Sequence, residues 1–208
     1  MTSVTAPLLD LDSRILSLLG NVGSEEVNLL IDFLLRADEK NAKEITLYVS
    51  SKGGDVIEGL KLIDTLRLLR APVTAVCFGQ VEGAGVILLA ACAKRVLFSS
   101  ALLSTGGLWA LPQIHHENRH PIGIHGQVDV RQILLAKVKK QVEQAIVAMP
   151  GKIPSFLADA TLPPRLFDAQ EAIQAGIADA IVTGAQRRLL KPPTKENHHA
   201  KSHSSCRL

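Results

Sequence analysis

The stretch Gly79-Gln80-Val81-Glu82-Gly83-Ala84-Gly85 decides the fold, because its glycines join an apolar strand to a short apolar helix. We expect the strand over Val73–Phe78 and the helix over the small-residue run Val86–Ala93. α/β enzymes often place a nucleophile and anion-binding amides at such a turn. The amides are present here, but no Ser, Cys, Thr or Lys stands between Gly79 and Gly85.

The order of strand, glycine turn and helix also occurs upstream. Ile45–Val49 reads as a strand, Ser50–Asp55 as a turn, and Val56–Leu69 carries apolar residues at helical spacing. This alternation with short links predicts an α/β fold with mostly parallel strands. The other expected elements are strands over Arg14–Leu19, Arg95–Phe98, Leu102–Thr105 and Ile177–Val182, and helices over Ser24–Leu35, Val128–Met149 and Ala169–Ala175. Broad apolar faces on Val27–Leu35 and Ile133–Val147 suggest packing against neighbouring subunits.

The composition fits one large domain followed by a tail. Of 208 residues, 47% are apolar and only 3% aromatic, so Leu, Ile, Val and Ala must build the core. The net charge is +3, and much of it comes from the last 25 residues, where basic side chains face the single acid Glu196. The rest of the chain is close to neutral, which gives no electrostatic support for nucleic-acid binding.

Targeting, membrane and metal patterns are not found in the sequence. Met1–Pro7 has neither the basic flank nor the apolar core of a signal peptide. Val86–Ala93 is far shorter than the ~20 residues of a membrane span. Cys77 and Cys92 lie in apolar runs, and with Cys206 they show no metal-ligand spacing, so we expect buried thiols. We therefore expect a cytoplasmic protein without cofactor, metal or membrane contact.

Taken in order, several segments resemble the proteolytic subunit of the Clp protease, ClpP. They are Ile45–Val56 with its Gly-Gly turn, Cys77–Gly85 around the nucleophile turn, Gly126–Val130 at the start of the long "handle" helix, and Ala169–Asp179. The resemblance runs from about Arg14 to Val182. It implies a ClpP/crotonase-like fold of repeated strand–strand–helix units with glycine turns and a handle helix.

The family's Ser-His-Asp triad falls on residues that carry no such side chains. By position, the resemblance places the serine at Gly83, the histidine at Gly106 and the aspartate at Ala160. A serine protease needs a hydroxyl nucleophile, an imidazole and an orienting carboxylate. This pattern resembles ClpR, the non-catalytic relatives of ClpP. The resemblance also implies that oxyanion-hole amides remain at Gly53 or Gly54 and at Ala84.

The resemblance further implies assembly. ClpP-like subunits form stacked rings of seven, so we expect partners to be copies of this chain, an active ClpP paralogue, or both. A AAA+ ATPase would then be contacted through partner subunits. The expected handle residues are Gln127, Asp129, Gln132 and Ile133.

Domain boundaries follow from the same comparison. Residues 14–183 are expected to form the ClpP/crotonase-like domain, with the handle at about 126–149 and an insertion at about 107–125. Residues 1–13 form a short N-terminal segment, and residues 184–208 are expected to be a disordered basic tail. The insertion carries His115, His116, His120 and His125, and the tail carries His198, His199 and His203; solvated polar segments are favoured over metal sites.

Two other functions stay open. A crotonase-type enzyme would use the amide oxyanion hole on an acyl-CoA thioester, with Glu82 as the base. A weakly active Clp serine peptidase is the other alternative. Against the crotonase, the chain is short for that family, the start of the handle helix resembles ClpP, and Glu82 is interpreted first as an exposed turn or interface acid. Against the peptidase, relocation of the nucleophile to Ser50, Ser51, Ser99, Ser100 or Ser104 is disfavoured.

Overall fold

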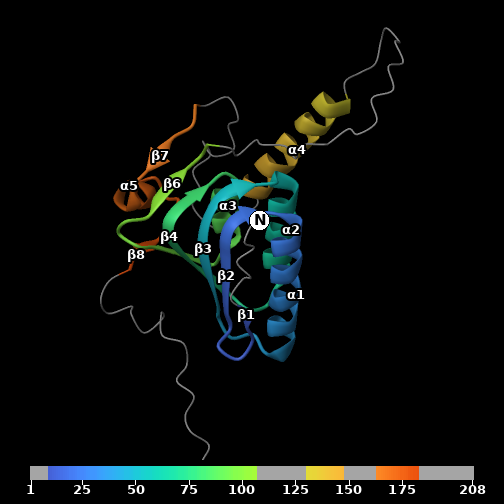
Figure 1. The fold of residues 1–208 in the computed structure, drawn as a ribbon, viewed down its shortest axis with the longest axis vertical. Coiled ribbons are helices and arrows are strands. Elements are labelled where there is room, and N and C mark those ends of the chain that lie inside the picture. The colour runs from blue at the N-terminus through green and yellow to red at the C-terminus, as the bar shows by residue number, and fades with distance from the viewer. Residues whose placement is uncertain (1–8, 107–129, 148–162, 183–208) are drawn as a thin grey trace, which may run out of the picture.

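A mixed sheet organises the described part of the chain, and helices pack against it (Figure 1). The computed structural model describes residues 9–106, 130–147 and 163–182. The strand order is β1-β2-β3-β4-β5-β8, with β6 beside the end of β4 and β7 beside β6. In chain order the elements are β1 (Leu9–Asp10), β2 (Ile15–Val22), α1 (Ser24–Lys40), β3 (Ile45–Gly54), α2 (Val56–Leu68), β4 (Val73–Glu82), α3 (Ala84–Ala91), β5 (Lys94–Leu97), β6 (Leu102–Ser104), α4 (Val130–Val147), β7 (Leu166–Phe167), α5 (Ala169–Gln174) and β8 (Ala180–Ile181).

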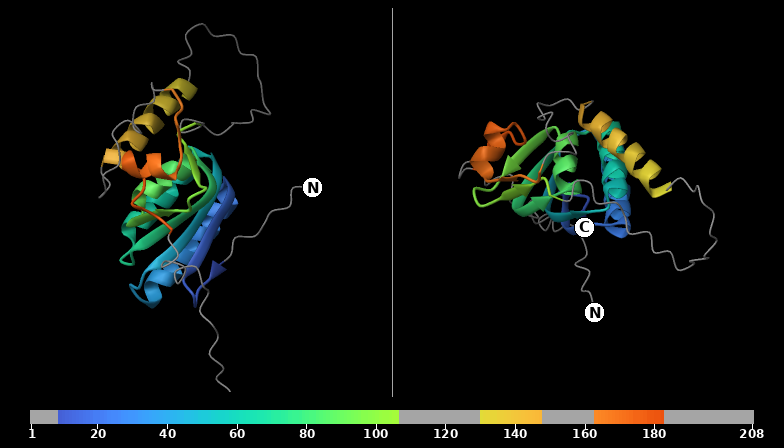
Figure 2. Two further views of the ribbon diagram at one scale, coloured as in Figure 1. Left: turned by 90° about the vertical axis from the view of Figure 1, so that its left-hand side faces the viewer. Right: turned by 90° about the horizontal axis from the view of Figure 1, so that it is seen from above.

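Strands β2 to β5 are parallel, and a helix joins each to the next. Right-handed crossovers between successive neighbouring strands place every connecting helix on the same face of a sheet. Helices α1, α2 and α3 accordingly share one face (Figure 2). The predicted α/β architecture with mostly parallel strands is confirmed.

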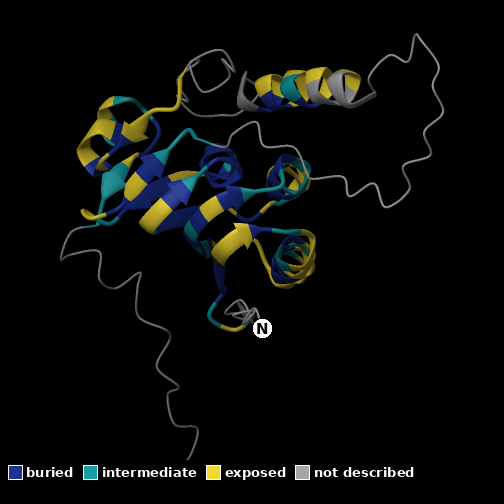
Figure 3. Cartoon of the chain, turned by 45° about the horizontal axis from the view of Figure 1, so that its top comes forward, coloured by how far each residue is buried: buried dark blue, intermediate teal, exposed yellow. Residues whose placement is uncertain are grey.

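Strand β3 shows how the core is built. Ile45, Leu47 and Val49 are fully buried, whereas Thr46 and Tyr48 between them are half-buried. Successive side chains of a strand point to opposite faces, so the first set faces the helices. Helix α3 has no polar face, because its first seven residues are all buried (Figure 3). The helix that follows the glycine turn is therefore held inside the molecule.

Two strands run further than the sequence predicts. β3 continues to Gly54 and β4 to Glu82, where the sequence suggests turns over Ser50–Asp55 and Gly79–Glu82. The reason is tertiary: β6 pairs with the last three residues of β4 in parallel register. Pairing partners decide strand formation more strongly than local propensity does. Gly83 alone forms the turn between β4 and α3.

Other predicted boundaries also change. Helix α1 starts at Ser24, as predicted, with Gly23 as its N-cap, but it runs to Lys40 instead of Leu35. β2 extends to Val22 instead of ending at Leu19. The predicted strand Ile177–Val182 is reduced to β8, two residues long. The two-residue strands β1 and β7 are too short to show a periodic pattern, so the sequence does not predict them.

The apolar faces of two helices are largely covered by the chain itself. In α1, Val27, Leu30 and Leu34 are fully buried in the core, which corrects the expectation that this face packs against a neighbour. In α4, the buried side chains are Val138, Val142 and Ala145, which follow one another at helical spacing. The exposed large apolar side chains of these helices are Leu29, Leu35 and Ile133, among the residues whose burial is described. No helix within the described ranges is long and apolar enough to cross a membrane.

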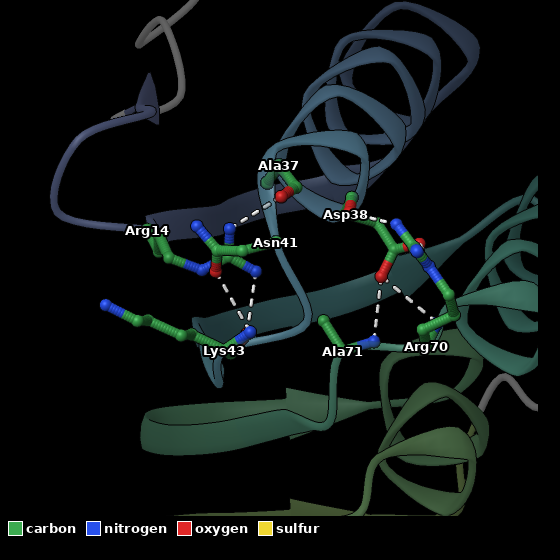
Figure 4. A network of polar contacts seen from close by, with 7 residues as sticks. All are labelled: Arg14, Ala37, Asp38, Asn41, Lys43, Arg70 and Ala71. Carbon is green, nitrogen blue, oxygen red and sulfur yellow. Dashed lines mark hydrogen bonds and ion pairs between the residues drawn. The ribbon is translucent and has the colours of Figure 1, made fainter.

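A buried arginine joins α1 to β3 (Figure 4). Arg14 has a positive φ of 55° and is only 8% exposed. Its guanidinium donates to the carbonyl oxygens of Ala37 (2.6 Å), Lys43 (2.6 Å) and Glu44 (3.3 Å). Burial lowers the pKa of Arg14, and the nearby Asp38 carboxylate opposes that shift. Arg14 thus satisfies carbonyls at the C-terminus of α1, where helices leave acceptors unpaired.

An ion pair joins the C-terminal elements to the sheet. The Arg95 side chain, 7% exposed, donates to Asp179 from Nη2 (2.7 Å) and Nε (3.0 Å). The Arg95 amide also donates to Asp179 Oδ2 (2.7 Å). These hydrogen bonds from the Arg95 side chain lower the pKa of Asp179, although partial burial opposes the shift. The pair fastens the segment before β8 to β5.

Candidate functional site

The candidate site is the turn at Gly83, at the carboxyl end of β4. Gly83 is the N-cap of α3, with φ 52° and ψ −123°. Its carbonyl accepts hydrogen bonds from the amides of Val86 (2.9 Å) and Ile87 (3.3 Å), which start the helix. This backbone conformation suits glycine, because side chains are strained at such positive φ. The carboxyl ends of parallel strands are where open α/β sheets place their sites.

The Gly-Gly end of β3 packs closely against this turn and against β2. A Cβ atom on Gly53 would lie 3.0 Å from the carbonyl oxygen of Glu82. A Cβ atom on Gly54 would lie 2.5 Å from the carbonyl oxygen of Val22, which is inside contact distance. Both glycines also have positive φ, 84° and 148°. Only glycine lets the three strand ends approach this closely.

Ser104 connects two positions of the site. Its carbonyl oxygen accepts the amide of Gly83 at 3.2 Å. Its hydroxyl accepts the amide of Gly106 at 3.1 Å. Strand register places Ser104 opposite Glu82 on β4 and opposite Leu166 on β7. The structure therefore brings Gly83 and Gly106 to the same end of the sheet, joined through one residue.

Ser51 makes a similar contact on the other side of the turn. It is 2% exposed, and its hydroxyl accepts the amide of Gly53 at 3.1 Å. The helix that follows is capped by Asp55, whose carboxylate accepts the Ile57 amide at 2.8 Å. The Gly53 amide is thus engaged within the chain.

Glu82, the candidate base, has a neutral partner. Its half-buried carboxylate accepts a hydrogen bond from the side-chain amide of Gln80. Gln80 and Glu82 alternate with buried Val81, so both point away from the helix face. A general base works best when a partner orients it toward the proton that it takes. The Gln80 amide is a neutral donor that can orient this carboxylate.

Several predicted site residues lie outside the described residues. These are Ala160, Gln127 and Asp129, and the histidines of both polar segments. Asp159, a carboxylate next to Ala160 that the sequence analysis does not include, also lies outside the described residues. Gln132 lies within α4, where its side chain is not described, and Ile133 is 44% exposed on the same helix. Within the described ranges, no group of three or more His, Cys, Asp or Glu side chains could hold a metal ion.

A groove of about 520 Å³ lies between α2 and α4, away from the residues that sequence reasoning singled out. Its described lining combines apolar Ile57, Leu60 and Ala145 with charged and amide side chains. None of Gly53, Gly83, Ala84 and Gly106 is among that lining. The groove and the glycine turn are therefore treated as separate features.

Sequence reasoning found the glycines of the site but undervalued its serines. Ser51 and Ser104 stand two residues before Gly53 and Gly106. A serine hydroxyl often accepts the amide of the residue two positions ahead, so this spacing could have indicated both contacts from the sequence.

A comparison with protein families gives one further finding: the family model described as Clp protease matches residues 4–185.

Proposed function

The chain belongs to the Clp protease family, and we propose that within it the chain is a non-catalytic subunit of the ClpR type. The observation that carries the proposal is the turn at Gly83. It joins a strand to a helix, as a nucleophile turn does, but its residue has no side chain. Without a hydroxyl at this point, covalent catalysis has no nucleophile to activate.

The other two proposed triad positions support the same conclusion. Gly106, tied to Ser104, supplies no imidazole to move a proton. Ala160 supplies no carboxylate to orient one. In our proposal three independent side chains are missing, so no single substitution restores the triad. Removing triad members from serine proteases lowers their rates by many orders of magnitude.

We propose that the role of the subunit is assembly. Clp protease family members form oligomeric rings and work with Clp ATPases. In the proposed complex this chain occupies stacked seven-membered rings with an active ClpP paralogue, in the cytoplasm, and meets a AAA+ ATPase through the active subunits. The proposed handle comprises about residues 126–149, with Gln127, Asp129, Gln132 and Ile133 as contact residues. Exposure of Ile133 on α4 supports this part of the proposal.

The experiment is labelling with a serine-reactive fluorophosphonate. The purified chain is treated alone and after co-expression with the active ClpP paralogue, and each band is read separately. We expect the paralogue to be labelled and to co-purify, while this chain stays unlabelled in both samples. Covalent label on any hydroxyl of this chain contradicts the proposal.

A crotonase-type activity is the second candidate, because the amides of Gly54 and Ala84 remain at the turn. Its oxyanion hole would hold a thioester carbonyl, and such donors contribute about 10²–10³ in rate where they act. The test is hydration of an enoyl-CoA thioester by wild type and by Glu82→Gln. Turnover that disappears in Glu82→Gln would favour this candidate; the non-catalytic proposal expects no turnover in either protein.

A further inference from the structure

Two serine hydroxyls occupy amide donors at the glycine turn. The amide of Gly53 donates to Ser51 Oγ, and the amide of Gly106 donates to Ser104 Oγ, each at 3.1 Å. Both contacts span two residues, so they form without help from distant segments. Each hydroxyl oxygen accepts the hydrogen bond that the amide would otherwise donate to an external carbonyl or anion.

Burial and packing hold these contacts in place. Ser51 is 2% exposed, so its hydroxyl exchanges no partner with bulk water. Gly53 packs against the end of β4, because a Cβ atom at this position would lie 3.0 Å from the Glu82 carbonyl oxygen. Ser104 is fixed from two sides, through the Gly83 amide and through its strand register with β4 and β7. The contacts belong to the fold and not to a mobile surface.

We propose that Ser51 and Ser104 are internal caps of this turn, which close the Gly53 and Gly106 amides to external carbonyls and anions. The inference rests on the proposed function, since it concerns the same turn. It adds that the site is closed by its own chain as well as lacking a nucleophile. Of the amides that the sequence analysis assigns to an oxyanion hole, those of Gly54 and Ala84 are not capped by these two serines.

Amide hydrogen exchange with residue resolution tests the caps. We expect Ser51→Ala to speed exchange of the Gly53 amide by roughly tenfold, since one hydrogen bond is lost. Ser51→Thr keeps a hydroxyl and should restore protection if Ser51→Ala folds poorly. Ser50→Ala, on the neighbouring residue, should leave the Gly53 amide unchanged. Equal exchange in wild type and Ser51→Ala overturns the proposal.

Ser104→Ala carries its own internal control. The Gly106 amide loses its acceptor, whereas the Gly83 amide keeps the main-chain carbonyl of residue 104. We expect faster exchange at Gly106 by roughly tenfold and no change at Gly83. If both amides become equally fast, Ser104 merely stabilises the sheet end, and the capping proposal fails.

A phosphate titration tests closure to ligands. Inorganic phosphate should not slow exchange of the Gly53 and Gly106 amides in wild type, but should slow both in the double variant Ser51→Ala/Ser104→Ala. If phosphate slows exchange of these amides in wild type, or slows it in neither protein, the proposal that the serines close the amides to ligands is overturned. The fluorophosphonate experiment is independent of this result, so a label on the chain would reject the proposed function while leaving the caps to be judged by exchange alone.

Discussion

At the scale of single residues, the glycines around the turn differ in backbone conformation and in the space available for a side chain. Gly54 combines a positive φ with a β-carbon position 2.5 Å from the Val22 carbonyl. Gly20 has a positive φ of 94° but nothing within 4 Å of that position. Gly83 has a positive φ of 52° and is the position that we propose for the family's nucleophile. Comparing these positions separates backbone strain from steric collision.

Alanine at Gly54 should destabilise the protein far more than alanine at Gly20. We expect Gly20→Ala to lower the free energy of unfolding by about 1 kcal/mol through strain alone. Gly54→Ala should cost about 3 kcal/mol or more, because the strand ends must separate as well. Urea unfolding of the two variants measures the difference. Equal costs would show that the close contact with Val22 is unimportant.

A serine restored at Gly83 should not restore activity. The hydroxyl of Gly83→Ser would have neither a base nor an oxyanion partner beyond backbone amides, so we expect no peptide hydrolysis. The positive φ should lower the free energy of unfolding by about 1 kcal/mol. Peptidase assays and fluorophosphonate labelling measure the first effect, and thermal unfolding measures the second. Robust labelling of this variant would mean that a base is already in place.

At the scale of elements, polar side chains join helices to strands. Arg14 satisfies the C-terminus of α1 and the approach to β3, while Asp38 accepts the amides of Ala71 (2.7 Å) and Arg70 (3.0 Å) beyond α2. Partial burial raises the pKa of Asp38, but these hydrogen bonds and Arg70 outweigh it, so the net pKa is lowered. Both contacts cross more than 20 residues of sequence and fix where helices end.

Removing Arg14 should weaken the fold clearly. Arg14→Met keeps the apolar stem but removes the donor to the Lys43 and Glu44 carbonyls and leaves the Ala37 carbonyl with only the 3.5 Å contact from the Asn41 amide, and we expect a loss of about 2–3 kcal/mol. Arg36→Met is the matched control, because Arg36 makes only an exposed pair with Asp32 one helical turn away. That pair should contribute about 0.3–0.5 kcal/mol. Urea unfolding compares them, and similar losses would contradict the assigned role of Arg14.

The Arg95–Asp179 pair should make stability depend on acid. The folded-state pKa of Asp179 is lowered, so the carboxylate contributes stability that is present above its unfolded pKa, about 4. This contribution is lost as the pH falls through the lower folded-state pKa. We expect Asp179→Asn to melt below wild type at neutral pH, with the gap closing toward pH 3. A gap that stays constant across this range would exclude the ion pair as its cause.

At the scale of the whole molecule, the polar and reactive side chains in the described part of the core are either hydrogen-bonded or uncharged. Cys77 and Cys92 are buried thiols, as the sequence predicts. Burial raises the pKa of Cys77 strongly and that of Cys92 to about 12. Within the described residues, every buried side-chain nitrogen and oxygen has a hydrogen-bond partner.

The buried thiols should be inert until the protein unfolds. In a Cys206→Ser background, we expect Cys77 and Cys92 to react with a disulfide reagent only in denaturant, because the thiolate is the reactive form. Their raised folded-state pKa values also imply that stability falls as pH rises above about 9, where unfolded thiols ionise. Native labelling rates and alkaline melting curves measure both effects. Rapid labelling of the native protein would contradict the burial.

The sequence by itself determined the alternation of strands and helices, the glycines at the turn, and the absence of Ser, Cys, Thr and Lys between Gly79 and Gly85. These are local properties, visible as periodicity and residue type. Tertiary structure decided that β4 runs to Glu82, that Ser104 joins Gly83 to Gly106, and that α4 packs its own stripe of Val138, Val142 and Ala145 into the core. Those outcomes depend on which distant segments pair, and a one-dimensional pattern does not contain the partner of a strand or of a helix face. The sequence therefore shows a glycine-rich strand-to-helix junction, whereas the contact of its Gly83 amide with the Ser104 carbonyl forms only when the strand ends are brought together.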